Sequence, residues 1–180
     1  GEFSRSQQRG EQTLFYTAPV GTHPSMTGVI LARAAEVVDE HPPALARPPR
    51  PGGISLFIAG HGTGNHENSR QAVERQVELI NGRNLYASTH AIFIEEEPSI
   101  GACYSLATTR EVVVVPFFIS DGLHSHEDIP QLLGESAAAV RERLRGGEPT
   151  FVNPTERHGR RVWYARSIGG EPRRGARGVY

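Results

Sequence analysis

The stretch "EVVVVPFFISDGLHSHEDIP", residues 111–130, is the most informative part of the sequence about the fold. Its first nine residues, 111–119, are almost continuously apolar, which is typical of a strand buried on both faces of a parallel sheet. Similar strands are predicted at 54–59, 86–95 and 161–167, and helical patterns at 67–82, 98–110 and 128–147 separate them. This alternation predicts an α/β fold, a doubly wound parallel four-stranded sheet with helices on both faces.

The segment before the first of these strands divides into three parts. Residues 1–12 have neither an initiator Met nor an apolar run, so we expect a tag or disordered tail and no secretory signal. Residues 13–18 predict a short strand and 25–40 an amphipathic helix. The Pro-rich segment 41–52 predicts a linker, after which 53–180 would form one α/β module, with a further helix beginning near its end.

A short internal similarity offers an explanation for residues 13–40, the alternative being a coincidental match in a short window. The sequence "LFYTAPVGTHP" (14–24) aligns without gaps with "VWYARSIGGEP" (162–172). In both copies a strand, a turn and a proline at a helix start follow one another. We therefore expect residues 13–40 to be the last strand and helix of a preceding module of the same kind.

Composition excludes several classes of function. The single cysteine, Cys103, excludes an intrachain disulfide framework, and an iron–sulfur cluster is not expected in this chain. Every basic residue is Arg, so there is no lysine for a Schiff base or a phosphate loop. The net charge of −1 argues against general nucleic-acid or membrane binding, and no apolar run approaches the ~20 residues of a membrane span. We expect a soluble cytoplasmic protein.

Histidines and carboxylates follow the predicted strands. In an open parallel sheet, ligands bind beyond the carboxyl ends of the strands, so these side chains are expected at one edge. The candidates are His61 after the first strand, Glu95, Glu96 and Glu97 after the second, Asp121, His124 and His126 after the third, and Ser167 with glycines 169–170 after the fourth.

Each candidate also has a structural interpretation. His61, between two glycines, could be a turn histidine, and the three glutamates could complement the dipole of the next helix. Asp128 or Ser125 is expected to cap the helix that follows, which leaves one of the two nearby histidines free to face the cleft. The chain has neither a phosphate-loop pattern nor a G-x-S-x-G nucleophile motif.

The order of four segments resembles the class II sirohydrochlorin chelatases of the CbiX/SirB type. These segments are "LFIAGHGTGN", "AIFIEEEPS", "VVVVPFFISDGLHSHEDIP" and "VWYARSIGGEP", and the resemblance covers residues 54–172. It implies a chelatase-like module that works with a second module, in the same full-length chain or in a dimer. It also implies insertion of Co²⁺, Fe²⁺ or Ni²⁺ into an anionic tetrapyrrole, sirohydrochlorin, towards cobalamin or sirohaem.

The resemblance implies three site residues. His61 matches the first metal-binding histidine of the family. His124, counted back from the "DIP" at 128–130, matches the second, and Glu95 matches an acidic residue after the second strand. Borderline divalent metals suit imidazole and carboxylate ligands, which agrees with this set. His126 then becomes a neighbour of the site, and Asp128 a residue at a helix start.

Two other functions remain open. The module could bind metal or tetrapyrrole, or support an interface, without catalysis. An unrelated α/β hydrolase or transferase is the third hypothesis, although no activated nucleophile is visible in the sequence. The separation of His61 and His124 in the folded chain distinguishes these hypotheses.

Overall fold

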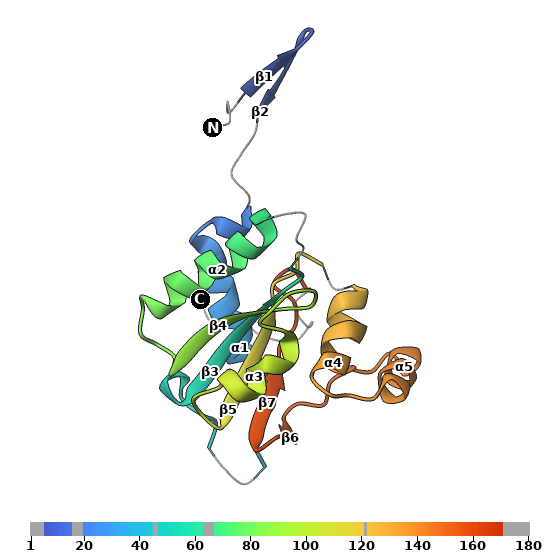
Figure 1. Ribbon diagram of the computed structural model, residues 1–180. Coiled ribbons are helices and arrows are strands. Elements are labelled where there is room, and N and C mark those ends of the chain that lie inside the picture. Colours follow the sequence, from blue (N-terminus) through green and yellow to red (C-terminus); the bar gives the residue numbers. More distant parts are fainter. Residues whose placement is uncertain (1–5, 16–19, 45–46, 63–66, 121, 171–180) are drawn as a thin grey trace.

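The computed structural model describes residues 6–15, 20–44, 47–62, 67–120 and 122–170 (Figure 1). Several predicted features lie wholly or partly outside these residues: positions 1–5 of the expected tail, positions 16–18 of the predicted strand, the loop 63–66, Asp121, and the helix expected to begin near the end of the chain. Among the described residues, no helix is both long enough and apolar enough to cross a membrane.

The sheet has five strands in the order β4-β3-β5-β7-β6. The four predicted strands are parallel: β3 (Ile54–Gly60), β4 (Ser88–Phe93), β5 (Glu111–Pro116) and β7 (Arg160–Tyr164). A short strand that the sequence did not predict, β6 (Thr155–Arg157), pairs antiparallel with β7 at the edge. The turn between β6 and β7 places His158 and Gly159 at positive φ, as tight hairpins require. The sequence did not predict β6 because all three of its residues are polar.

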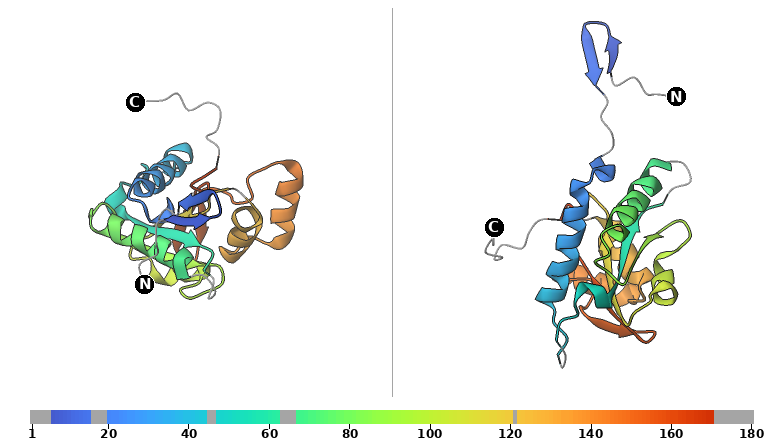
Figure 2. Two further views of the ribbon diagram at one scale, coloured as in Figure 1. Left: turned by 90° about the horizontal axis from the view of Figure 1, so that it is seen from above. Right: turned by 90° about the vertical axis from the view of Figure 1, so that its left-hand side faces the viewer.

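Helices cover both faces of the sheet, which confirms the α/β architecture. Successive strand residues point to opposite faces. On one face, Leu56 and Ile58 pack beneath α1 (Ser25–Glu40) and α2 (Glu67–Asn81). On the other face, Phe57 and Ala59 pack with η3 (Ile100–Ala102), α3 (Cys103–Leu106) and α4 (Ile129–Leu132). Figure 2 shows α1 and α2 side by side.

The predicted helix at 128–147 is wrong as a single element. It is replaced by a π-helical turn η4 (His124–Asp128), by α4, and by α5 (Ala137–Gly146). Gly134 takes a φ of 98°, a conformation that L-residues rarely adopt, and so breaks the helix. Ser136 starts α5 by accepting a hydrogen bond from the backbone N–H of Ala139. The helix expected at 98–110 is likewise reduced to η3 and α3.

The described parts of the expected tail, 6–12, and of the strand predicted at 13–18 form a hairpin. β1 (Ser6–Arg9) and β2 (Gln12–Phe15) form an exposed antiparallel hairpin that projects from the rest of the chain (Figures 1 and 2). It is followed by the short η1 (Val20–Thr22) and then by α1, whose bounds match the predicted helix.

The helix α1 belongs to the same hydrophobic core as the strands. Ile30, Val37 and Val38 are at most 5% exposed and share a cluster with Trp163 of β7. The indole Nε1–H of Trp163 donates a hydrogen bond to the carbonyl oxygen of His41, at 2.9 Å. The Pro-rich segment, which ends in η2 (Pro51–Gly53), therefore connects two parts of one core.

Candidate metal centre

Two glycines hold His61 at the carboxyl end of β3. A Cβ on Gly60 would come within 2.8 Å of a Val73 methyl carbon, and one on Gly62 within 2.9 Å of Phe93 Cβ. Gly62 also has a φ of 66°. The carbonyl oxygen of His61 accepts hydrogen bonds from the backbone N–H groups of Ile94 and Glu95, both at 3.1 Å. Close packing therefore fixes His61 against the end of β4.

His124 is the first residue of η4, which is tied to the rest of the fold through Ser125. The Gly122 N–H donates a hydrogen bond to Ser125 Oγ at 3.0 Å. The hydroxyl of Tyr164, on β7, donates to the Ser125 carbonyl oxygen at 2.8 Å. A π-helical turn of this kind is often found at functional sites. Here it holds the His124 backbone at the same edge of the sheet as His61.

The structure brings His61 and His124 together. Their ring centroids are 4.6 Å apart and the ring planes meet at 83°. Phe118 stacks on His124 as well, with ring centroids 6.1 Å apart and planes at 30°. His61 and His124 come from different strand ends, so the sheet topology makes the pair and no local motif does.

Each histidine of the pair has a carboxylate beside its Nδ1 atom. Asp128 Oδ2 is 2.7 Å from His124 Nδ1, which is hydrogen-bonding distance. Glu95 Oε2 is 3.6 Å from His61 Nδ1, which is within ion-pairing distance but beyond a hydrogen bond. The Nδ1 of His61 also lies 3.4 Å from the Gly62 carbonyl oxygen. Within the described residues, no hydrogen bond engages the Nε2 atom of either ring.

The other predicted carboxylates have different partners. Glu96 forms an ion pair with Arg70 at 2.8 Å. Glu97 accepts a hydrogen bond from the backbone N–H of Ser99. Among the three glutamates, Glu95 is therefore the one beside the histidine pair. The prediction that Asp128 caps a helix is wrong, because its side chain makes no capping hydrogen bond and instead contacts His124.

The lone cysteine does not belong to this site. Cys103 is fully buried on the α3 face of the sheet. Burial raises the pKa of its thiol to about 12, so the thiolate that binds metals is scarce at neutral pH. Imidazole and carboxylate groups are therefore the ligands that this edge of the sheet offers.

The histidine pair is an open arrangement. Over the described part of the chain, no group of three or more His, Cys, Asp or Glu side chains is arranged to hold a metal ion. The His61 side chain is 26% exposed, that of His124 47%, and that of Glu95 54%. Two imidazoles with an exposed carboxylate nearby can bind a borderline divalent ion and release it, because the described residues around the pair leave all three side chains partly open to solvent.

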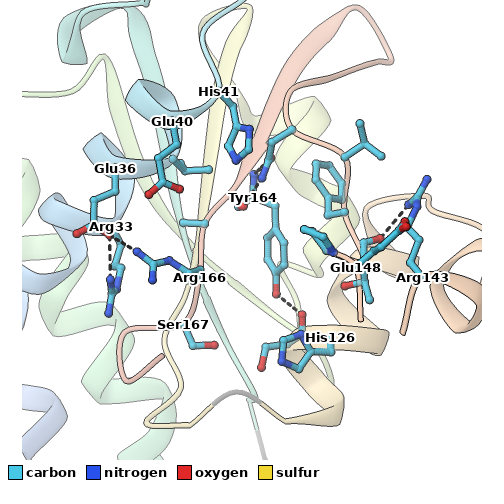
Figure 3. A pocket seen from close by; sticks show the side chains of 18 residues that line it. Arg33, Glu36, Glu40, His41, His126, Arg143, Glu148, Tyr164, Arg166 and Ser167 are labelled. Carbon is cyan, nitrogen blue, oxygen red and sulfur yellow. Dashed lines mark hydrogen bonds and ion pairs between the residues drawn. The ribbon is translucent and has the colours of Figure 1, made fainter. Parts of the chain in front are cut away.

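A separate cavity of about 470 Å³ lies along the edge of β7, between α1 and residues 148–153 (Figure 3). His126 and the predicted Ser167 line this cavity. Of the two histidines in "HSH", His124 therefore contacts His61 and His126 faces the cavity. The charged groups on its wall include three arginines that are already paired: Arg33 and Arg166 with Glu36, and Arg143 with Glu135. No local motif predicts this cavity, because its wall is drawn from elements far apart in the chain.

Known proteins resemble this chain in sequence and in structure. "Probable sirohydrochlorin cobaltochelatase" from Halobacterium salinarum is 34% identical over 162 residues, which cover 90% of this chain and 50% of that protein. "Sirohydrochlorin ferrochelatase, chloroplastic" from Arabidopsis thaliana is 34% identical over 86 residues, 46% of this chain and 38% of that protein. The chain spans about half the length of the first of these relatives.

Among solved structures, the multi-domain protein DR2241 from Deinococcus radiodurans, described as structurally similar to chelatases, superimposes with a TM-score of 0.58. The match has 22% sequence identity and covers 91% of this chain and 30% of that one, so it supports the fold alone. The family model for CbiX matches residues 55–174, which span β3 to β7 and include both histidines of the pair. The chain therefore belongs to the CbiX family.

Proposed function

We propose that the full-length protein inserts a divalent metal ion into sirohydrochlorin. The observation that carries this proposal is the contact between His61 and His124, with ring centroids 4.6 Å apart at the open edge of the sheet. The family match and the cobaltochelatase and ferrochelatase names of the relatives support it. Co²⁺, Fe²⁺ and Ni²⁺ all suit the ligands present, so metal supply decides among them.

In this reaction the metal ion is a substrate. His61 and His124 would hold it through their Nε2 atoms, and Glu95 would act as a third ligand or as a proton acceptor. Insertion breaks two pyrrole N–H bonds and forms four metal–nitrogen bonds, so two protons leave the macrocycle. A neutral imidazole or the Glu95 carboxylate can take these protons. The exposure of Glu95 allows it to move between the two tasks.

The full-length protein is also proposed to contain a second chelatase-like module. The Halobacterium relative is about twice as long as the aligned region, which leaves room for such a module. In chain order, residues 13–40 would be its last strand and helix, while α1 contributes its buried side chains to the core of the module at 53–180. The tetrapyrrole, an anionic partner, would bind between the two modules, where the histidine pair is exposed. We further propose that the protein works in the cytoplasm.

The test is insertion of Co²⁺ or Fe²⁺ into sirohydrochlorin by the full-length protein, followed by the absorbance of the macrocycle. His61→Ala and His124→Ala should each lower the initial rate at least about 100-fold. Glu95→Gln should lower the initial rate less than either histidine variant does if Glu95 only accepts protons, because an imidazole can take them instead. His126→Ala is the matched control, because His126 lies on the same turn but faces the cavity, and it should keep the wild-type rate. Wild-type rates in both His61 and His124 variants would overturn the proposal.

A second candidate function is metal or tetrapyrrole carriage without catalysis. It is favoured by the open pair, which lacks a three-ligand cluster among the described residues. Equilibrium binding of Co²⁺ and of sirohydrochlorin by the full-length protein, with no metallated product after prolonged incubation, would establish it in place of the chelatase activity.

A further inference from the structure

Asp128 and His124 form a close pair at the two ends of η4. The Oδ2–Nδ1 distance is 2.7 Å, at the short end of the range for charge-assisted hydrogen bonds. The two residues are four apart on a helical turn, so their side chains lie on one face. Asp128 has no capping contact that would compete for its carboxylate.

The backbone on both sides of this pair is anchored. Next to His124, the Ser125 carbonyl oxygen is held by the Tyr164 hydroxyl (Figure 3). Next to Asp128, Ile129 is fully buried against the sheet. The hydrogen bond therefore joins two side chains whose main chains are already fixed. This reduces the conformational entropy that an exposed ion pair ordinarily loses.

The two carboxylates beside the histidine pair are held differently. Asp128 Oδ2 makes a short hydrogen bond to His124 Nδ1, whereas Glu95 Oε2 lies 3.6 Å from His61 Nδ1, beyond hydrogen-bonding distance, and both carboxylates are partly exposed. A locked carboxylate can orient an imidazole but cannot easily move to a metal ion. A free carboxylate can move to the metal but orients its neighbour weakly. The geometry thus separates an orienting task from a binding task.

We propose that Asp128 is a positioning residue for metal capture by His124. Resting on the proposed function, this assigns Asp128 as the acceptor of the His124 Nδ1–H. That bond fixes the neutral tautomer in which Nε2 carries the lone pair and aims it to the metal position beside His61. Histidines that bind metals commonly donate their other N–H to a carboxylate in this way.

A direct test reads the tautomer of His124 in the metal-free, full-length protein. Long-range ¹H–¹⁵N spectra at about pH 8, where a free imidazole is neutral, separate the Nδ1–H form from the Nε2–H form. The wild-type protein should show His124 as the Nδ1–H form, and Asp128→Ala should give a mixture of both. A wild-type His124 in the Nε2–H form would overturn the proposal, as would an Asp128→Ala spectrum identical to wild type.

Co²⁺ binding measured by calorimetry gives the second readout. Asp128→Ala should weaken Co²⁺ binding about 10–100-fold. In the insertion assay, the same variant should raise KM for the metal more than it lowers kcat. Asp128→Asn keeps an acceptor oxygen of the same shape and should restore part of the affinity. Glu127→Gln, on the same turn but outside the hydrogen bond to His124, is the control and should bind Co²⁺ as wild type does.

The His124→Ala variant separates failure of this inference from failure of the proposed function. If His124→Ala weakens Co²⁺ binding and Asp128→Ala does not, Asp128 has no positioning role and the metal site stands. If His124→Ala itself leaves Co²⁺ binding unchanged, the proposed metal site is wrong. Thermal unfolding of each variant identifies losses caused by misfolding, and the wild-type tautomer remains decisive if Asp128→Ala does not fold.

Discussion

At the scale of single residues, glycines set how closely the backbone approaches the histidine pair. Gly60 and Gly62 flank His61, and Gly169 lies against the segment that leads to His124. A Cβ on Gly169 would overlap the carbonyl group of Ile119, and its N–H donates to the Phe118 carbonyl oxygen at 3.1 Å. Because the obstacle is backbone, a side chain here can be accommodated only by moving residues 118–120.

Gly169→Ala is therefore expected to destabilise the protein by about 1–3 kcal/mol, the usual cost of overpacking. It should also weaken Co²⁺ binding, because the displaced segment leads to His124. Urea denaturation and calorimetry measure the two effects. Gly28→Ala is the matched control: Gly28 is exposed on α1, and an added Cβ would meet no atom within 4 Å. Alanine should stabilise the helix there by about 0.5–1 kcal/mol. Equal stability of the two variants would contradict the close backbone contact at Gly169.

At the scale of elements, α1 and α2 are joined by a buried polar side chain. Gln76 of α2 is fully buried. Its Oε1 accepts a hydrogen bond from the Thr27 hydroxyl at 2.7 Å, and its Nε2 donates to the carbonyl oxygens of Gly21 and His23 at 2.7 and 3.1 Å. A buried amide with its hydrogen bonds satisfied fixes the position of one helix on another, because a slipped arrangement would leave these groups without partners.

We expect Gln76→Leu to lower the free energy of unfolding by at least about 2 kcal/mol, since each buried polar group left unpaired costs about 1–3 kcal/mol. Amide hydrogen exchange should also accelerate at the start of α1, which loses its contact with α2. Gln71→Leu, an exposed position on the same helix, provides the comparison and should change stability by less than about 0.5 kcal/mol. Slow exchange at the start of α1 in both variants would show that the network does not hold the helix.

At the scale of the whole molecule, α1 completes the core of the module that follows the Pro-rich segment. Ile30, Val37 and Val38 are buried against the sheet. Full burial of a Val or Ile side chain contributes about 1.5–3 kcal/mol, so three of them approach the net stability of about 5–15 kcal/mol of an ordinary domain. The strands without α1 would expose a large apolar face.

A protease site inserted after Pro48, an exposed residue of the connecting segment, tests this dependence. After cleavage in the full-length protein, the α1 segment should stay bound in gel filtration and separate only in denaturant. Two adjacent alanines supply a matched pair, since Ala34 is 2% exposed and Ala35 is exposed. Ala34→Asp should release the cleaved segment and Ala35→Asp should not. Release of the wild-type segment under native conditions would contradict the shared core.

The class of fold and the histidines worth testing could be predicted from the sequence without the structure. Apolar runs such as "EVVVV" predict parallel strands because a strand buried on both faces has no polar side, and His61, Glu95 and His124 follow strand ends. The edge strand β6, whose three residues are polar, and the break of the last predicted helix at Gly134 could not be predicted in this way. Short elements depend on contacts with distant residues, which a local pattern does not record.

The partners of the candidate residues, by contrast, follow from the folded chain alone. The sequence offered three glutamates after β4 and two histidines in "HSH". The fold pairs Glu96 with Arg70, turns His126 to a cavity beside β7, and places His124 against His61. Asp128 leaves its expected role as a helix cap for a hydrogen bond with His124, because a π-helical turn and not a regular helix start forms at that point. Side-chain direction depends on local backbone winding and on packing across the sheet, and neither is encoded in the spacing of residue types.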